Sequence, residues 1–301
     1  MTTNRWAKIL RKLGHKVSIN AAENRCDLLV AIHAERTGKQ LLAFGRKYPD
    51  RPTVLLLAGT DIYSPKGFSA RATNAIDKAE YLVTLEPNAK AKLNPRWRAK
   101  ANVIPQSAIR PRRIPEPLKS CFEVSLCGHL RPVKQPFFAA EAALHLPPES
   151  KIRINHYGKA LCANMKQSAL AWMKKSDRYR WAGLKPHWQT RQLIARSQLL
   201  INTSLSESSA NSIVEAIVSG TPVLASAVAG NKGILTASYP GLFPVASPHK
   251  LAKLIFRLET DKKLFQQLKS RCVKIARNHT FNVEAAAWKS LLAKIFPDRS
   301  A

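Results

Sequence analysis

The stretch from Leu199 to Leu235 constrains the fold of this chain more than any other. It holds a short apolar run, a polar turn at Glu207, a helical pattern that stops at Gly220, and a second apolar run over residues 222–228. A strand, a helix and a strand joined by such short turns belong to a parallel sheet. The sequence therefore predicts an α/β fold.

Two glutamates lie in the turn and the helix of this stretch. Glu207 precedes the helix, and Glu215 follows it after seven intervening residues, within an apolar stripe. A carboxylate there is costly unless it is paired, and a sugar or ribose hydroxyl at the carboxyl end of the sheet would be such a partner. Asn211 and Ser212 add amides that would hold a phosphate. Carboxylates near a helix start also stabilise the helix dipole, so capping remains an alternative.

The charge of the chain indicates an anionic partner. Its 301 residues leave room for two domains, and 49 basic against 19 acidic residues give a net charge of +30. A phosphorylated small molecule, a membrane surface or a nucleic acid would fit this excess. The bases are spread over the chain, and the tryptophans sit mainly in apolar patterns rather than among the bases. We therefore expect no nucleic-acid role.

Cysteine usage and hydropathy indicate a soluble, cytoplasmic protein. The five cysteines show no Cys-x-x-Cys spacing, and an odd count without a signal sequence favours a reducing compartment. No apolar run approaches the ~18 to 20 residues that span a bilayer. A peripheral membrane contact stays open, because Trp6, Ile9, Leu10 and Leu13 form one apolar face beside basic residues. An ordinary helix that covers a sheet would show the same pattern.

The first half of the chain alternates helical and strand patterns, which predicts helices on both faces of a parallel sheet. A polar loop, Gly59-Thr60-Asp61, follows the third expected strand. The expected helices are 5–13, 35–48 and 69–78, and the expected strands are 15–19, 27–33, 53–58, 81–85 and 102–105.

The order of the first elements departs from that of a doubly wound domain. Such a domain opens with a strand and a glycine-containing loop, whereas this chain opens on the helix at 5–13. The missing strand would be central, and its absence would leave two interior strands with unpaired edges. We therefore expect this sequence to be shorter than the functional domain, so that either translation begins upstream or the first domain is damaged.

The second half restarts the same alternation after a linker at 110–119, which holds three prolines among basic residues. Before the central stretch we expect strands at 122–127, 151–157 and 179–182, and helices at 136–146, 163–175 and 188–197. Beyond Val245 only helices are expected, at 248–260, 262–277 and 283–296.

The loop from Gly128 to Lys134 follows the first strand of the second half. In a doubly wound domain this is the turn that faces phosphate, and Arg131 and Lys134 are placed to neutralise a diphosphate. Two bases in so basic a chain could equally be solvated surface. Together with the two glutamates, the loop gives a positive clamp and a hydroxyl-binding carboxylate pair, which suits a nucleoside diphosphate sugar.

The sequence lacks the motifs of several other chemistries. It contains no Asp-x-Asp, no His/Cys cluster with metal-ligand spacing, no nucleophile elbow and no P-loop. We therefore expect no metal or other cofactor.

In the loop from Gly128 to Lys134 and in the pair Glu207 and Glu215, the chain resembles the GT-B glycosyltransferases of family 4. The resemblance implies two doubly wound, Rossmann-like domains facing a cleft: residues 1–111 on the acceptor side, 112–280 for the nucleotide sugar, and a final helix, 281–301, packing back on the first domain. It implies that Glu207 approaches the sugar and Glu215 the ribose. The implied donor-binding residues are Gly128, His129, Arg131, Lys134, Asn211, Ser212, Glu215 and Asn231.

Two positions depart from the family pattern. The family's arginine, which directly follows the glycine, is His129 here, with Arg131 displaced by two positions. The glycine pair expected after Glu207 is Ser208 and Ser209, which narrows the space for backbone to approach a sugar.

The chain is similar, more narrowly, to the selenosugar synthases of selenoneine biosynthesis. The segments that carry this likeness include GTDIY, VIPQSA, GHLRPVKQP, RYRWAGLKPHW and ANSIVEA. The resemblance implies transfer of a sugar from a UDP-sugar, typically UDP-N-acetylglucosamine, to selenophosphate. A family 4 enzyme with a saccharide or lipid acceptor, and a non-catalytic relative, remain as alternatives.

The roles expected of Thr60 and Asp61 depend on the kind of acceptor. An oxygen nucleophile would need a general base, and Asp61 is the one clear candidate. Selenophosphate is already ionised and polarisable, so positioning and charge complementarity would suffice. Thr60 and Asp61 would then orient the anionic acceptor. The alternative is that Asp61 only caps its loop.

Overall fold

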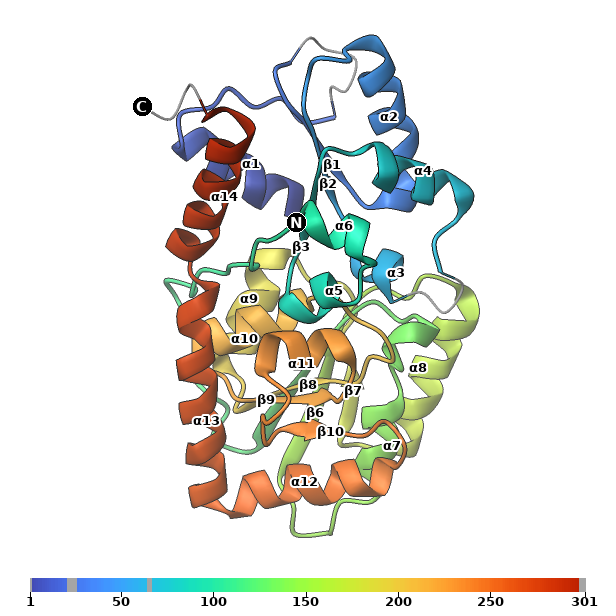
Figure 1. Cartoon of the computed structure of the whole chain (residues 1–301). Helices are drawn as coiled ribbons and strands as arrows, with labels where there is room; N and C mark the ends of the chain where they lie inside the picture. The colour runs from blue at the N-terminus through green and yellow to red at the C-terminus, as the bar shows by residue number, and fades with distance from the viewer. Residues whose placement is uncertain (1, 21–25, 64–66, 298–301) are drawn as a thin grey trace. The chain divides into compact units, whose positions relative to one another are not determined.

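The computed structural model describes residues 2–20, 26–63 and 67–297, which form two compact units (Figure 1). Unit 1 consists of Met1–Ser107 together with Asn278–Ala301, and unit 2 consists of Ala108–Arg277. Each unit contains one all-parallel sheet with helices packed against it. The predicted α/β fold is therefore confirmed.

The sheet of unit 1 pairs its four strands in chain order. Its strands are β1 (Leu29–Ile32), β2 (Thr53–Leu56), β3 (Tyr81–Thr84) and β4 (Ala101–Val103). Successive side chains of a strand point to opposite faces, so Leu55 joins one core and Val54 and Leu56 join another. The first core is shared with α2 (Ala34–Lys47) and α4 (Ala70–Lys78), and the second with α1 (Thr2–Lys12) and α14 (Phe281–Ile295).

Short helices complete unit 1. They are α3 (Gly59–Ile62), α5 (Pro87–Ala91), α6 (Pro95–Ala99) and the 3-10 turn η2 (Arg277–His279), which begins in unit 2 and leads into α14. The segment predicted to be a polar loop is therefore the single helical turn α3.

The strand predicted at 15–19 is wrong, because its backbone groups are used by the end of α1. The amide of His15 donates to the carbonyl of Leu10 at 3.0 Å, and Arg11 donates to the carbonyl of Val17 at 2.8 Å. The expectation of two interior strands with unpaired edges is also wrong for the described strands. β2 pairs with β1 on one edge and with β3 on the other.

A buried carboxylate joins the first and last helices of unit 1. Glu284, on α14, accepts hydrogen bonds from Arg5 Nε at 2.9 Å, from Trp6 Nε1 at 2.8 Å and from the Ser107 amide at 3.0 Å. The Trp6 and Trp288 rings meet edge to face, with centroids 4.7 Å apart. The two helices are thus held by both apolar and polar contacts.

The apolar face of α1 lies inside unit 1. Trp6, Ile9 and Leu10 are buried against α14, β2 and β3, and Leu13 packs at the margin of the same core. The proposed membrane contact through this face is therefore wrong, and α1 covers a sheet. Within the described ranges, no helix is both long and apolar enough to cross a bilayer.

The sheet of unit 2 has six parallel strands in the order β10-β9-β8-β5-β6-β7. The strands are β5 (Phe122–Cys127), β6 (Ile152–Tyr157), β7 (Tyr179–Trp181), β8 (Leu199–Asn202), β9 (Val223–Ser226) and β10 (Leu242–Phe243). Its helices are η1 (Pro132–Lys134), α7 (Phe138–Leu144), α8 (Ala163–Lys175), α9 (His187–Arg196), α10 (Asn211–Ser219), α11 (Ala229–Leu235), α12 (Pro248–Thr260) and α13 (Lys262–Ala276). Of these, η1, α11 and β10 lie outside the predicted elements. Residues 110–119 form neither helix nor strand.

The strand order reverses direction at the pair β5 and β8. From β5 the chain first builds outward through β6 and β7, then returns to the other side of β5 and builds through β8, β9 and β10. This is the doubly wound order, in which ligands bind at the carboxyl ends of the strands beside the reversal.

Removing the Glu284 carboxylate is expected to destabilise unit 1. Glu284→Ala leaves the buried donors of Arg5 and Trp6 without their acceptor, which should lower the free energy of unfolding by roughly 3 to 5 kcal/mol. Urea unfolding followed by tryptophan fluorescence measures this change. The control Lys289→Ala alters an exposed residue of the same helix and should change stability by less than about 0.5 kcal/mol. Equal losses in the two variants would contradict this role.

Candidate functional site

A buried histidine holds the backbone of the loop after β5 in place. His156, on β6, places Nε2 3.0 Å from the Gly128 carbonyl and Nδ1 2.8 Å from the Tyr179 hydroxyl. Because a carbonyl can only accept, Nε2 carries the hydrogen and Nδ1 accepts from the tyrosine. Burial lowers the pKa of His156 to about 4, so the ring stays neutral in this arrangement.

Gly158 allows the two loops after β5 and β6 to touch. A Cβ at Gly158 would lie 1.9 Å from the Gly128 carbonyl oxygen, which no side chain could tolerate. The loop after β5 therefore follows one path, on which Leu130 is buried and forms a parallel bridge with Ala160.

The loops after β5 and β8 are joined across the reversal point. Thr203 Oγ1 donates to the carbonyl of Lys134 at 2.9 Å and to that of Gln135 at 3.0 Å. The Leu205 amide donates to the Val133 carbonyl at 2.8 Å. These bonds bring the Lys134 side chain to the carboxyl end of β8.

Lys134 and Glu207 form an ion pair at this edge. Ser204 Oγ donates to the same Glu207 oxygen at 2.7 Å, and both side chains of the pair are mostly buried. Gly230, at the start of α11, packs so closely that a Cβ there would lie 2.0 Å from the Glu207 carbonyl oxygen. The structure thus brings the predicted diphosphate lysine and the predicted sugar carboxylate into direct contact.

Glu215 has a partner that the sequence did not indicate. Its Oε1 lies 2.6 Å from Nε2 of His187, the first residue of α9. The thiol pKa of Cys127, the last residue of β5, is raised by burial and secondarily by the Glu215 charge. Glu215 itself lies on α10, the helix that follows β8.

The start of α10 has no side-chain cap that would occupy its backbone amides. Ala210 precedes the helix and provides no side-chain cap, and Asn211 and Ser212 are partly exposed. Asn231, by contrast, is fully buried and donates to Asn202 Oδ1 at 3.1 Å and Ser226 Oγ at 3.0 Å. The structure places Asn231 beneath the site, where it holds neighbouring side chains.

The remaining loop residues differ in charge. His129 Nδ1 accepts from the Lys159 amide at 3.1 Å, and its pKa is lowered by burial and by the charges of Arg131, Lys134 and Lys159. The residue in the place of the family's arginine therefore favours the neutral form. Arg131, within the loop, is half-buried and directly precedes η1.

Asp61 belongs to unit 1, and its carboxylate is occupied by backbone amides of that unit. Its carboxylate accepts from the amides of Ala34 at 3.0 Å, Glu35 at 3.3 Å and Ala58 at 2.8 Å, and it lies 2.8 Å from His33 Nδ1. These contacts stabilise the starts of α2 and α3. Thr60 lies in the same helical turn, and its side chain is outside the described part of the structure.

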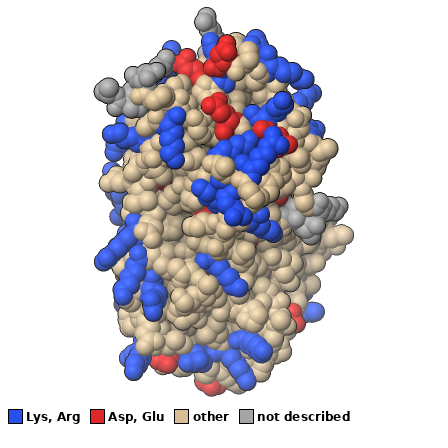
Figure 2. Space-filling view, viewed as in Figure 1, with Lys and Arg blue, Asp and Glu red and all other residues tan. Residues whose placement is uncertain are grey.

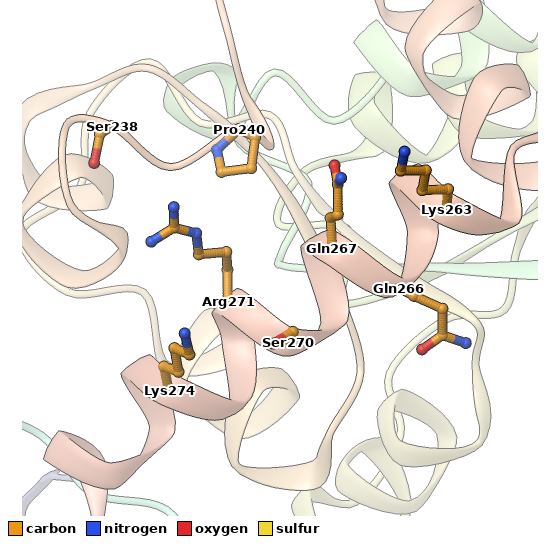
Figure 3. Close-up of a pocket in the computed structure, with 8 residues that line it drawn as sticks. All are labelled: Ser238, Pro240, Lys263, Gln266, Gln267, Ser270, Arg271 and Lys274. Carbon is orange, nitrogen blue, oxygen red and sulfur yellow. The ribbon is translucent and has the colours of Figure 1, made fainter.

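A surface hollow lies against α13, away from the loops after β5 and β8. Its volume is about 800 Å³, and Figure 3 shows Arg271 extending from α13 into the space that Ser238 and Pro240 border. All eight lining residues are exposed, and none is a predicted site residue. We interpret it as an open surface hollow without the buried polar groups of a catalytic site.

Two surface features bear on partners. Figure 2 shows Lys and Arg residues distributed over the visible face rather than collected in one patch. Among the residues with described positions, no group of three or more His, Cys, Asp or Glu side chains could hold a metal ion.

The chain has a fold of the GT-B type. A doubly wound unit carries a basic loop and two carboxylates at its reversal point, and a second parallel α/β unit accompanies it. The chain belongs to the family Glycosyl transferases group 1, which matches residues 120–279.

Solved structures share this fold at low sequence identity. One is HepE from Anabaena in complex with UDP, with 19% identity, a TM-score of 0.75, and coverage of 95% of this chain and 82% of that chain. Another is the pneumococcal O-GlcNAc transferase GtfA in complex with UDP and GlcNAc, with 15% identity, a TM-score of 0.73, and coverage of 97% and 60%.

A curated relative also matches in sequence. Glycosyltransferase 1 domain-containing protein 1 of Xenopus tropicalis is 27% identical over 175 residues, which is 57% of this chain and 50% of that protein. The match thus spans half the length of the relative.

Sequence reasoning missed His187, His156 and Ser204. The scattered histidines gave no spacing signal, because each contact joins residues from different strands or loops of the sheet. Ser204 lies three positions before Glu207, so its proximity was a usable signal.

The pH dependence of stability should report the neutral state of His156. Its pKa of about 4 in the folded protein lies below the ordinary 6.5, so the unfolded chain takes up the proton first as the pH falls. Stability should drop by about 3 kcal/mol between pH 7 and pH 4 from this group alone. Urea unfolding of His156→Gln should show a shallower decline, whereas His15→Gln, which alters an exposed residue, should decline as the wild type does. Parallel curves for all three proteins would refute this assignment.

Proposed function

We propose that this protein transfers N-acetylglucosamine from a UDP-sugar to selenophosphate. The observation that carries the proposal is the ion pair of Lys134 and Glu207 at the carboxyl end of β8 in a member of the Glycosyl transferases group 1 family. Glu215 lies on α10, which follows the same strand. The UDP in the HepE and GtfA complexes supports the choice of nucleotide. Unit 2 would bind the donor and unit 1 the acceptor.

Each donor group has a residue of matching chemistry. Lys134 provides a positive charge for the diphosphate, and the open amides of Asn211 and Ser212 would hold its oxygens. Glu215 would accept from the ribose hydroxyls, and Glu207 would contact the sugar. Because Lys134 and Glu207 are paired in the structure, donor binding must exchange part of this contact for one to phosphate.

The state of Asp61 supports an acceptor that needs no general base. Its oxygens accept three backbone hydrogen bonds and contact His33, and these contacts occupy the lone pairs that a base would use. Selenophosphate is ionised without help, so it can attack once it is oriented. The sequence likeness to selenosugar synthases supports the same acceptor.

The transfer step balances without a cofactor. The selenium of selenophosphate forms a bond to the anomeric carbon while the bond from that carbon to the diphosphate oxygen breaks. UDP leaves with the electron pair. We propose that Lys134 and the α10 amides neutralise the leaving charge, so that no metal ion is needed. We also propose a cytoplasmic location, in keeping with five free cysteines.

Mass spectrometry of the products tests this function. Purified protein, UDP-N-acetylglucosamine and enzymatically generated selenophosphate should give UDP and a selenosugar, and the yield should persist in a metal chelator. Parallel reactions with UDP-glucose and with alcohol acceptors define the donor and the acceptor class. Transfer only to an alcohol would replace selenophosphate with a saccharide or lipid acceptor, and no transfer to any acceptor would indicate a non-catalytic relative.

Lys134→Ala should weaken UDP binding at least tenfold. A hydrogen bond to a charged group contributes about 1.5 to 3 kcal/mol, and the variant also leaves Glu207 without its cation beside the diphosphate. Calorimetric titration with UDP measures the change. Lys166→Ala removes the same charge from an exposed position on α8 and should bind UDP as the wild type does. Unchanged affinity in Lys134→Ala would remove Lys134 from the donor site.

A further inference from the structure

We infer that His187 is a positioning residue that orients Glu215 toward the ribose of the nucleotide. The inference rests on the proposed function, in which Glu215 binds the ribose hydroxyls. His187 begins α9, after β7, whereas Glu215 lies on α10, after β8, so the contact joins two helices that follow strands of the same sheet.

The geometry of the pair fits an orienting role. His187 Nε2 lies 2.6 Å from Glu215 Oε1, a short separation typical of a charge-assisted hydrogen bond. The imidazole can donate from Nε2 in its neutral or its protonated form. With Oε1 held in this way, Oε2 is the oxygen left for a ribose hydroxyl.

The burial of the pair is asymmetric. The His187 side chain is 49% exposed, whereas the Glu215 side chain is 10% exposed and lies among the buried residues Val214 and Ala216. A carboxylate on an apolar helix face is costly without a donor, and His187 is its hydrogen-bond partner among the described residues. The half-exposed ring leaves one side of the pair accessible to a ligand.

The location of Glu215 also fits a nucleotide. Glu215 lies on α10, which follows β8, and β8 pairs with β5 at the point where the sheet order reverses. Nucleotides bind at this point of doubly wound sheets. A contact that serves stability alone would fit the same distance, so the test must separate orientation from stability.

Calorimetric titration with two nucleotides makes this separation. UDP carries both ribose hydroxyls, and 2′,3′-dideoxy-UDP carries neither. We expect His187→Ala to weaken UDP binding about tenfold or more and to leave the affinity for the dideoxy nucleotide unchanged. His187→Gln retains an N–H donor and should recover part of the loss, and it takes the place of His187→Ala if that variant does not fold. Gln189→Ala, on the same helix, serves as the control and should bind both nucleotides as the wild type does.

Steady-state kinetics gives a second measurement. If His187 orients a contact that is equal in the ground and transition states, His187→Ala should raise the KM for the UDP-sugar and leave kcat unchanged. An equal loss of affinity for both nucleotides, or unchanged UDP affinity, would overturn the role of His187. Wild-type protein that binds neither nucleotide would instead refute the proposed function itself.

Discussion

The parallel pairing of β5 with β8 is the constraint on which the site of unit 2 depends. Because all six strands run in the same direction, this one pairing brings the loops that follow β5 and β8 to the same edge. The loop after β5 packs against Gly158, which follows β6, and the loop after β8 packs against Gly230, which follows β9. Any side chain at either glycine would strike backbone. The strand order alone thus brings residues that are distant in the sequence close together.

Three mostly buried carboxylates of unit 2 each lie beside a cation or a potential cation. Glu123 is paired with Arg196, Glu207 with Lys134, and Glu215 with His187. A buried charge without a partner would destabilise the fold by several kcal/mol, and these pairs avoid that penalty. The pairs differ in what a ligand could do to them. The Glu123 side chain is fully buried and its pair serves the fold, whereas Lys134 and His187 keep exposed surface through which a ligand can compete or cooperate.

Patterns within one element were predictable, and contacts between elements were not. The apolar run of β5 and the helical period of α8 gave their observed ends. The burial of Glu215 indicated that it needs a partner, but His187 lies 28 positions earlier, and only the sheet brings the two together. The strand predicted from the apolar alternation at 15–19 does not form, because residues at the end of α1 make hydrogen bonds to that backbone. The loop that ends at Asp61 became a helical turn because its carboxylate caps two helix starts.

The tie between Glu284 and the first helix sets an order for events during translation. Unit 1 combines the segment up to Ser107 with the helix that follows unit 2, so a ribosome finishes all of unit 2 before α14 is made. Unit 2 can complete its sheet during synthesis. Until α14 emerges, Val54, Leu56 and Val83 lack part of their cover, and this is the interval in which a chaperone has the most apolar surface of unit 1 to bind.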